Sequence, residues 1–359
     1  MFNSCYKNKK VLVVGHTGFK GSWLVNWLYY LEANIYGLSK KNINRSLNYD
    51  SSNVKKKLKK EYDFDVRNFS KLKNTIKTIK PDYIFYLAAQ SLVGSSYNDP
   101  HETWTINLLG GLNLLEIIKK INFKTNLILI TSDKCYENIE KKSGYKESDT
   151  LGGSDPYSAS KASVEILYKS YFQSYYKYNK KINSATVRAG NVIGGGDVSQ
   201  NRIIPDCIKS WKNNKKTQIR NPKSTRPWQH VLEPIGGYLL LGSYLAKNKY
   251  NGESFNFGPT VKNSKSVKYL INEVKKNLPN FKFQFSKVNS FKEHNLLQLN
   301  CKKAKEKLNW NPRLSFKNTV KFTLEWYKRF YKKEDMSDYC IYQIKKFIEY
   351  EKKNKNNKK

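Results

Sequence analysis

The feature that most constrains the fold is a glycine loop near the start of the chain. Residues 10–14 form a short apolar run rich in valine, which is typical of a buried parallel strand. Gly15, Gly18 and Gly21 follow it, and residues 22–32 then have the apolar spacing of a helix. Glycines between a strand and a helix allow a tight turn and let a phosphate approach the helix N-terminus. The loop therefore predicts a dinucleotide-binding unit.

Strands and helices continue to alternate up to about residue 190. Further strands are predicted at 35–38, 83–87, 126–131 and 181–188, and further helices at 103–119 and 157–175. The lysine run at 55–60 is predicted to be a surface loop. Regular alternation indicates an α/β fold, namely a Rossmann-type doubly wound parallel sheet. Beyond residue 190 the chain is punctuated by Pro, Gly and Asn, which predicts a smaller C-terminal substrate-binding lobe.

These patterns divide the chain into a cofactor part, a substrate part and a tail. We predict a dinucleotide-binding Rossmann domain over residues 1–190, with return segments around 228–260. The substrate-binding lobe is predicted to comprise residues 191–227 and 261–345. Residues 346–359 are predicted to be a disordered tail, because the last of them are nearly all Lys and Asn.

A net charge of +37 raises a second class of function, nucleic-acid binding. Only 8 of the 66 basic residues are Arg, the residue that nucleic-acid readers use for bidentate contacts. Lys is abundant together with Asn, Ile, Tyr and Phe, while Ala occurs only 9 times. This combination is typical of AT-rich codons. We therefore interpret most of the charge as solvated surface and expect no nucleic-acid partner.

From the cysteines and the apolar stretches we expect the protein to be cytoplasmic. The 5 Cys form no CxxC pair, so neither a zinc site nor a disulfide framework is predicted. Residues 1–10 lack the apolar core of a signal peptide. The longest apolar stretch, 235–246, falls short of the ~20 residues that span a membrane. We expect no metal and no membrane association.

Tyr157 and Lys161 form a Tyr-x-x-x-Lys pair at the start of a predicted helix. A spacing of four residues puts both side chains on one helix face. An ammonium beside a phenol favours the phenolate, so we expect Lys161 to lower the pKa of Tyr157 from its usual value of about 10. A phenolate can accept a hydroxyl proton while a hydride leaves the same carbon.

Five motifs resemble the extended short-chain dehydrogenase/reductase family, and within it the CDP-glucose 4,6-dehydratases. They are GHTGFKGSWL at 15–24, AAQSLV at 88–93, TSDKCY at 131–136, RAGNVIGGGD at 188–197 and RPWQHVLEP at 226–234. The resemblance covers roughly residues 10–326. It implies conversion of CDP-glucose to CDP-4-keto-6-deoxyglucose and water, in deoxysugar biosynthesis for cell-surface polysaccharide. NAD is implied to take a hydride from C4 and return it to C6.

The resemblance also implies five catalytic residues. Tyr157 is expected to accept the C4 hydroxyl proton, while Lys161 assists it and binds the nicotinamide ribose. Ser132 is expected to hydrogen-bond the C4 oxygen, and Asp133 to protonate the departing C6 hydroxyl. Related dehydratases for other nucleotides usually have Glu at the position of Lys134. We expect Lys134 to assist C5 deprotonation or stabilise the enolate, through water if it stays charged.

Two sets of binding residues are also predicted, one for the cofactor and one for the substrate. The residues predicted to bind the cofactor are Gly15, Thr17, Gly18, Phe19, Lys20, Gly21, Asp65, Val66, Leu87, Ala88, Ala89, Gln90, Tyr157 and Lys161. The residues predicted to bind the substrate are Asn191, Arg202, Arg226 and Glu293, although the segment around Glu293 departs from the family pattern. Residues 39–41 are Ser-Lys-Lys, without the acidic residue that favours NAD, so the residues themselves leave NAD or NADP open.

Two of the polar residues have simpler explanations. Arg226 could form an ion pair with Glu233 rather than hold a diphosphate. His16 is interpreted as part of the loop structure rather than as a catalyst.

Several other functions stay open. A dehydratase for another nucleotide sugar, or a 4-epimerase, shares the glycine loop and the Tyr-x-x-x-Lys pair, but an epimerase has no need of Asp133 and Lys134. A basic nucleic-acid-binding protein rests on the charge alone. An inactive cofactor-sensing member is disfavoured, because all four polar residues expected for catalysis are present, namely Ser132, Asp133, Tyr157 and Lys161. Family members commonly pair through two helices each, so we expect a homodimer or a higher homo-oligomer.

Overall fold

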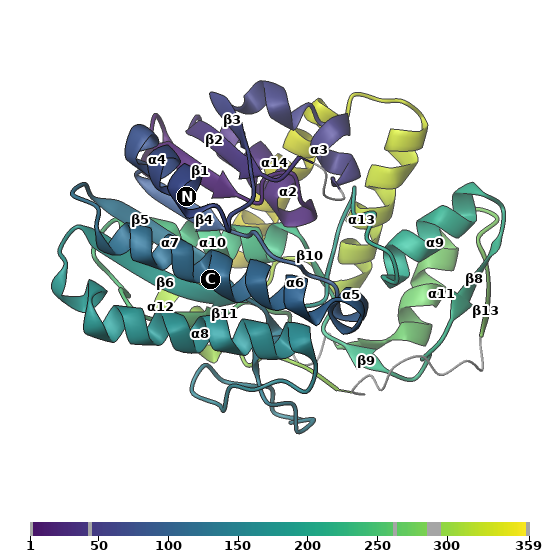
Figure 1. Cartoon of the computed structure of the whole chain (residues 1–359). Coiled ribbons are helices and arrows are strands. Elements are labelled where there is room, and N and C mark those ends of the chain that lie inside the picture. Colours follow the sequence, from purple (N-terminus) through teal and green to yellow (C-terminus); the bar gives the residue numbers. More distant parts are fainter. Residues whose placement is uncertain (1–2, 42–44, 261–263, 286–295, 357–359) are drawn as a thin grey trace.

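The fold is organised around one parallel sheet with helices on both faces (Figure 1). The computed structural model describes residues 3–41, 45–260, 264–285 and 296–356, with side chains described up to residue 350. The sheet has seven strands in the order β11-β6-β5-β4-β1-β2-β3, and all neighbours are parallel. The strands are β1 (Lys10–Val14), β2 (Asn34–Ser39), β3 (Lys60–Asp63), β4 (Tyr83–Tyr86), β5 (Thr125–Ile130), β6 (Ile182–Arg188) and β11 (Ser254–Asn256). The predicted fold class is confirmed.

Each face of the sheet is covered by its own helices. Val11 and Val13 of β1 join one apolar cluster, whereas Leu12 and Val14 join the cluster on the other side. Successive side chains of a strand point to opposite faces, so a strand buried on both faces must be apolar throughout. The helices on the first side are α2 (Phe19–Tyr30), α10 (Leu232–Leu245) and α14 (Met336–Asn356), and those on the second are α4 (Phe69–Ile79), α7 (Gly110–Lys119) and α8 (Pro156–Ser174).

The strand order reverses between β1 and β4, and this reversal positions the site. From β1 the chain continues to β2 and β3 on one side of the sheet, while β4, β5 and β6 extend on the other. Gly15 and Leu87 are the first residues beyond β1 and β4. In open parallel sheets, ligands bind outside the carboxyl ends of the strands at such a switch point.

Shorter elements that follow β6 gather beside the sheet (Figure 1). Three two-stranded sheets pair β7 with β10, β9 with β12, and β8 with β13, while β11 returns to the large sheet beside β6. The remaining elements are α1 (Asn3–Tyr6), α3 (Leu47–Ser51), α5 (Val93–Asn98), α6 (Pro100–Trp104), β7 (Val192–Ile193), α9 (Ile203–Lys212), β8 (Lys216–Ile219), β9 (Thr225–Arg226), β10 (Gln229–His230), β12 (Lys265–Ser266), α11 (Val267–Asn277), β13 (Lys282–Phe285), α12 (Lys302–Leu308) and α13 (Phe316–Tyr331). The proposed domain boundaries remain predictions.

Two predicted segments differ from the structure. The run at 55–60 is not simply a surface loop, because it contains the end of a 3₁₀ turn (Val54–Lys57) and the first residue of β3. The helix predicted at 103–119 is interrupted by a π-helical turn, Thr105–Leu109, between α6 and α7. Such turns are often found at functional sites, and this one borders the cavity described below.

The predicted disordered tail is also wrong for residues 346–356, which belong to α14. Phe347 is only 1% exposed and its ring lies 5.7 Å from that of Trp27 on α2. These apolar contacts anchor the helix, although its end is rich in Lys. In the part of the chain that is described, no helix has both the length and the apolar character needed to cross a membrane.

Candidate active site

A cavity of about 1430 Å³ lies at the switch point between β1 and β4. It is lined by residues from the glycine loop, from the ends of β4, β5 and β6, from the start of α8 and from the lobe. All of the predicted catalytic, cofactor-binding and substrate-binding residues line it except Glu293. Glu293 lies outside the described residues. The structure thus brings together side chains from the whole length of the chain.

The glycine loop is packed too closely to admit side chains at two of its three glycines. A Cβ on Gly21 would lie 2.1 Å from the carbonyl oxygen of Gly15. Gly15 itself has a φ of +92°, and a Cβ there would lie 2.9 Å from the backbone nitrogen of Ala88. Gly18 caps α2 without a side chain, so the first N–H groups of the helix are directed at the cavity edge. This arrangement fits a pyrophosphate.

The loop is held against β2 by a buried histidine. The His16 ring is completely buried and lies within 3.0 Å of Ser39 Oγ through Nδ1 and 2.8 Å of Glu61 Oε1 through Nε2. Burial lowers the pKa of His16, and the bond to Glu61 opposes that effect. The ring is therefore engaged on both sides within the protein, which supports its interpretation as loop structure.

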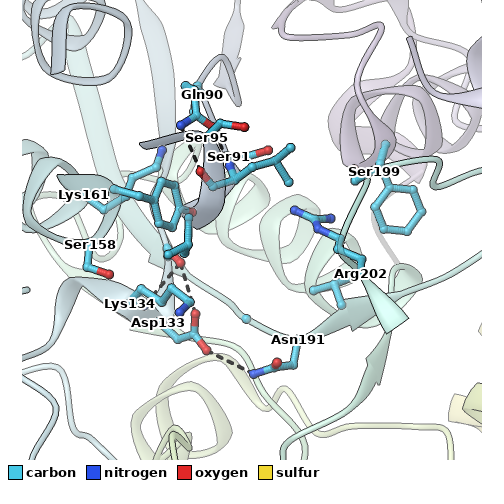
Figure 2. Close-up of a pocket in the computed structure, with 18 of the residues that line it drawn as sticks. Gln90, Ser91, Ser95, Asp133, Lys134, Ser158, Lys161, Asn191, Ser199 and Arg202 are labelled. Atoms are coloured by element: carbon cyan, nitrogen blue, oxygen red, sulfur yellow. Dashed lines mark hydrogen bonds between the residues drawn. The ribbon is translucent and has the colours of Figure 1, made fainter. Parts of the chain in front are cut away.

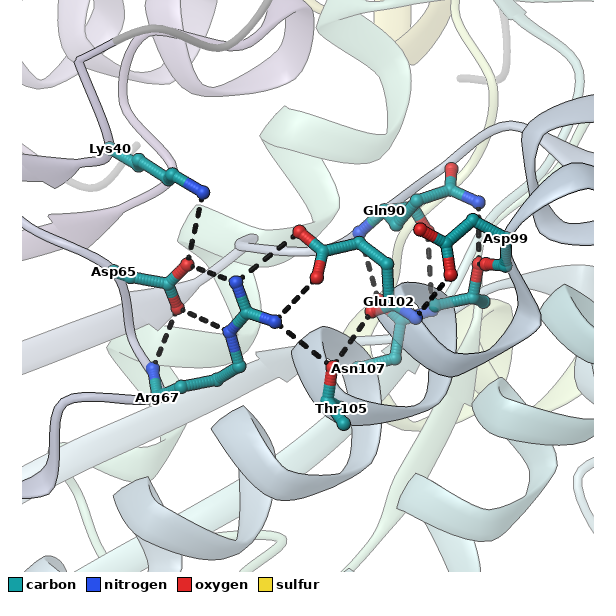
Figure 3. Close-up of polar contacts among 9 residues, drawn as sticks. Lys40, Asp65, Arg67, Gln90, Asp99, Glu102, Thr105 and Asn107 are labelled. Carbon is teal, nitrogen blue, oxygen red and sulfur yellow. Dashed lines mark hydrogen bonds and ion pairs between the residues drawn. The ribbon is translucent and has the colours of Figure 1, made fainter.

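Just beyond β3, Asp65 belongs to a network of charges (Figure 3). The guanidinium of Arg67 donates to Asp65 Oδ2 at 2.6 Å and to Oδ1 at 3.0 Å, and Lys40 Nζ lies 3.5 Å from Oδ2. Arg67 also donates to Glu102 at 2.5 Å and to Thr105 in the π-helical turn at 3.0 Å. Burial alone would raise the pKa of Asp65, but the bonds from Arg67 hold it below its usual value.

The predicted redox residues meet at the carboxyl end of β5. Ser132 and Asp133 follow β5, and the Ser132 hydroxyl donates to Asp133 Oδ1 at 3.1 Å. The same hydroxyl shares a hydrogen bond with the phenol of Tyr157, which with Lys161 lies in the first two turns of α8. All four side chains are nearly buried. Asn191 Nδ2 reaches Asp133 Oδ2 at 3.5 Å (Figure 2).

The expected lowering of the Tyr157 pKa is wrong. The pKa of Tyr157 is raised to about 12, mainly by burial and also by the Asp133 charge, while the Ser132 hydrogen bond and Arg202 oppose this rise only in part. Lys161 is itself desolvated, and burial together with the charge of Lys20 lowers its pKa to about 8. Removal from water disfavours the charged forms of both groups, and this is the largest cause of each shift.

Lys134 and Arg202 occupy opposite sides of the cavity. Figure 2 shows Lys134 and Lys161 on one side and Arg202 on the other, with Asn191 between them. Lys134 is half-buried in a 3₁₀ turn, and its N–H donates to Ser132 Oγ at 3.3 Å. Arg202 donates to the buried Asp197 at 3.1 Å.

Arg226 lies on β9 at the lobe side of the cavity, where its guanidinium donates to the Thr225 carbonyl at 3.1 Å. Glu233, the alternative ion-pair partner, accepts the backbone N–H groups of Arg313 at 2.8 Å and Leu314 at 2.7 Å. The cation that acts on the Glu233 carboxyl is Arg313. This carboxylate therefore serves to join α10 to the segment before α13.

Sequence reasoning missed a buried ion pair directly behind Ser132. Glu165 and Arg188 are 2% and 3% exposed, and Arg188 Nη2 lies 2.8 Å from Glu165 Oε2. Glu165 also accepts from the hydroxyls of Thr131 and Thr186, while Arg188 donates to the Tyr136 hydroxyl at 2.7 Å. Glu165 is four residues after Lys161, on the face that turns inward, and this spacing was the available signal.

Among the described residues, no cluster of His, Cys, Asp and Glu could hold a metal ion.

Comparison with known proteins gives a family and several relatives. The family described as GDP-mannose 4,6 dehydratase matches residues 12–323. CDP-glucose 4,6-dehydratase of Salmonella typhimurium is 38% identical over 340 residues, which cover 92% of this chain and 94% of that protein. CDP-paratose 2-epimerase of Salmonella typhi is 25% identical, with 88% and 98% covered.

Solved structures of similar fold cover nearly the whole chain. A dTDP-glucose 4,6-dehydratase from Bacillus anthracis, in complex with NAD, has a TM-score of 0.75 at 21% identity, with 90% of this chain and 98% of that one covered. A UDP-glucuronic acid 4-epimerase from Bacillus cereus has a TM-score of 0.76 at 23% identity, with 90% and 100% covered. At these identities the likeness is one of fold.

Proposed function

The chain belongs to the GDP-mannose 4,6-dehydratase family, and on that premise we propose that it is an NAD-dependent CDP-glucose 4,6-dehydratase. The observation that carries the proposal is the 38% identity to a CDP-glucose 4,6-dehydratase along almost the full length of both chains. The cavity adds chemical support, because it gathers an acid, a cation and a phenol: Asp133, Lys134 and Tyr157. A simple 4-epimerase has no use for the first two.

The cofactor would lie along the glycine loop and reach the base of α8. Gly15, Gly18 and the N-terminus of α2 would hold its pyrophosphate, and Lys161 its nicotinamide ribose. When bound, NAD accepts a hydride from C4 of the sugar and returns it to C6. The Asp65 carboxylate, kept ionised by Arg67, would repel a 2′-phosphate, and Lys40 is already engaged with it at 3.5 Å. This charge supports NAD over NADP.

Oxidation at C4 needs a base for the hydroxyl proton, and Tyr157 would fill that role. The Asp133 charge raises the pKa of Tyr157. Protonation of Asp133 would remove that contribution and would favour the phenolate, together with the Ser132 hydrogen bond and Arg202. The same proton that makes Asp133 an acid therefore helps to make Tyr157 a base.

Elimination then removes water across C5 and C6. The C4 ketone acidifies the C5 hydrogen, and Lys134 would assist its removal by water or stabilise the enolate. The C6–O bond breaks as protonated Asp133 supplies the proton with which the hydroxyl leaves. Asn191, at 3.5 Å from Asp133 Oδ2, would hold the acid towards the sugar.

The diphosphate of the substrate needs cations at the lobe side of the cavity. Arg202 and Arg226 would supply them, since a guanidinium matches a phosphate in a bidentate manner. Arg202 is steadied by Asp197 at 3.1 Å and stays partly exposed to the cavity. Lys20 lies near Asp133 and Arg202, and burial lowers its pKa to about 8. An incoming phosphate would raise that pKa and favour the charged ammonium.

Incubation of the purified protein with CDP-, dTDP-, UDP- and GDP-hexoses tests the proposal. We expect a 4-keto-6-deoxy product from CDP-glucose, identified by NMR, without net consumption of NAD. Turnover of another nucleotide sugar with none of CDP-glucose would overturn the substrate assignment. Formation of the C4 epimer without loss of water would overturn the dehydratase assignment.

We further propose that the enzyme is a cytoplasmic homodimer. The five cysteines are all free, which fits a reducing compartment. Leu109, directly before α7, is 40% exposed, and Ile166 on α8 is 57% exposed. Covering these apolar side chains would stabilise a pair of α7–α8 units. Sedimentation equilibrium of Ile166→Glu against the unchanged chain tests the interface, and an unaltered dimer in the variant would refute it.

A further inference from the structure

The Asp133 carboxyl occupies the space in which a side chain at residue 190 would lie. Gly190 lies two residues beyond β6 and lines the cavity. A Cβ on Gly190 would lie 1.7 Å from Oδ2, 1.9 Å from Cγ and 2.2 Å from Oδ1 of Asp133. Non-bonded heavy atoms approach to about 3.5 Å at closest favourable contact. A side chain at residue 190 and the Asp133 carboxyl in its observed place therefore exclude each other.

The backbone of Gly190 gives no other reason for glycine. The glycines with positive φ are Gly15, Gly144, Gly196 and Gly252, so Gly190 has a conformation that other residues adopt. The three atoms nearest to the position of its missing Cβ all belong to the Asp133 carboxyl. The nearest obstacle to a side chain at this position is therefore a single functional group.

Gly190 is also prevented from moving aside. The buried Gln229 donates from Nε2 to the Gly190 carbonyl at 3.1 Å and to the Phe257 carbonyl at 2.9 Å. The amide thus ties the turn after β6 to the end of β11. With the backbone held in this way, an added methyl group would be accommodated by rotation of the Asp133 side chain into another rotamer. Its bonds with Ser132 and Asn191 would then be lost.

We propose that Gly190 is a positioning residue that allows the site to eliminate water rather than stop at the ketone. This inference rests on the proposed function, in which Asp133 protonates the departing C6 hydroxyl. In that step the C5 proton passes to a water molecule with the assistance of Lys134, and the electron pair of the C5–H bond forms the C5–C6 double bond. The C6–O bond breaks, and the C6 hydroxyl leaves as water with the proton of Asp133. Oxidation at C4 uses Tyr157 and does not require the carboxyl.

The experiment compares Gly190→Ala with a matched glycine variant, Gly111→Ala. A Cβ on Gly111 would lie 3.8 Å from its nearest neighbour, in Val164, which is ordinary contact. Each NAD-loaded protein is mixed with CDP-glucose in a single turnover. Reduced cofactor is followed by its near-ultraviolet absorbance, and 4-keto-6-deoxy product is quantified by NMR in quenched samples.

We expect Gly190→Ala to oxidise C4 within a few-fold of the unchanged enzyme and to eliminate water at least about 100-fold more slowly, so that reduced cofactor accumulates. Gly111→Ala should behave as the unchanged enzyme does. Elimination at an unchanged rate in Gly190→Ala, or equal loss of both steps in a folded variant, would overturn the inference. Failure of the unchanged enzyme to make any dehydrated product would overturn the proposed function instead.

A double variant covers the case in which Gly190→Ala does not fold. Asp133→Ala removes the carboxyl and frees the space, so Asp133→Ala with Gly190→Ala should match Asp133→Ala alone in thermal stability and in elimination rate. A double variant that unfolds like Gly190→Ala would show that the obstacle is not Asp133. An elimination rate clearly below that of Asp133→Ala would show that Gly190 acts by another route.

Discussion

Replacing Glu165 with alanine would leave the guanidinium of Arg188 charged, only 3% exposed and without its carboxylate. Removing one partner of a buried ion pair costs about 3–5 kcal/mol. Arg188 would keep the Tyr136 hydroxyl at 2.7 Å and the Glu147 carbonyl at 3.3 Å, which favours the lower part of that range. The hydroxyls of Thr131 and Thr186 keep other partners, the Val187 carbonyl at 3.2 Å and Ser254 Oγ at 2.8 Å, so they add little to the loss. We expect a total loss of roughly 3–4 kcal/mol in the free energy of unfolding.

Urea unfolding followed by tryptophan fluorescence measures this loss. Glu165→Gln keeps the shape and one acceptor and removes the charge, so it should cost about 1.5–3 kcal/mol. Glu165→Leu combined with Arg188→Met removes both charges and should cost less than Glu165→Ala alone. A loss below about 1 kcal/mol for Glu165→Ala, or a double variant that costs the sum of its single changes, would refute the reasoning.

Three further predictions concern single groups. The Asp133 charge raises the pKa of Tyr157, so Asp133→Asn should shift the pH profile of C4 oxidation to lower pH, measured in single turnovers; a shift to higher pH contradicts the coupling. Burial raises the pKa of Glu233 to about 7, so its contribution to stability is present at acidic pH and is lost as pH rises towards 7. Glu233→Gln keeps an acceptor for the N–H groups of Arg313 and Leu314 but cannot ionise. As the pH rises from about 5 to about 8, through the Glu233 pKa of about 7, the urea midpoint of this variant should fall less than that of the unchanged chain. Gly21→Ala puts a Cβ 2.1 Å from the Gly15 carbonyl and should weaken NAD binding in calorimetry at least about 10-fold, while Gly18→Ala, at 3.4 Å, should weaken it less.

Local patterns predicted the sheet and the members of the cavity, because both depend on short-range order. Gly15 and Gly21 signal a turn at a helix N-terminus, and a spacing of four residues puts Tyr157 and Lys161 on one face. The edge strand β3 was missed, since its sequence Lys-Glu-Tyr-Asp is polar and its residues are at most partly buried.

Quantities that depend on burial were beyond local patterns. The pKa of Tyr157 is raised mainly because the phenol is buried, and burial is a property of the assembled cavity. The partners Glu165 and Arg188 are 23 residues apart and meet only once α8 packs on β6. Gly190 and Asp133 are likewise distant in sequence, so their mutual exclusion is visible only in three dimensions.

The cavity at the switch point between β1 and β4 is lined in two ways, by backbone groups on one side and by side chains on the other. On one side the ligand would be held largely by backbone groups of the glycine loop, where Gly15 and Gly21 leave no room for a side chain. On the other side the lining comes from side chains of Arg202, Gln218, Arg220 and Arg226, on short elements after β6. Transplanting residues 202–226 between related chains is therefore a direct route to enzymes that accept a new nucleotide while the redox machinery stays untouched.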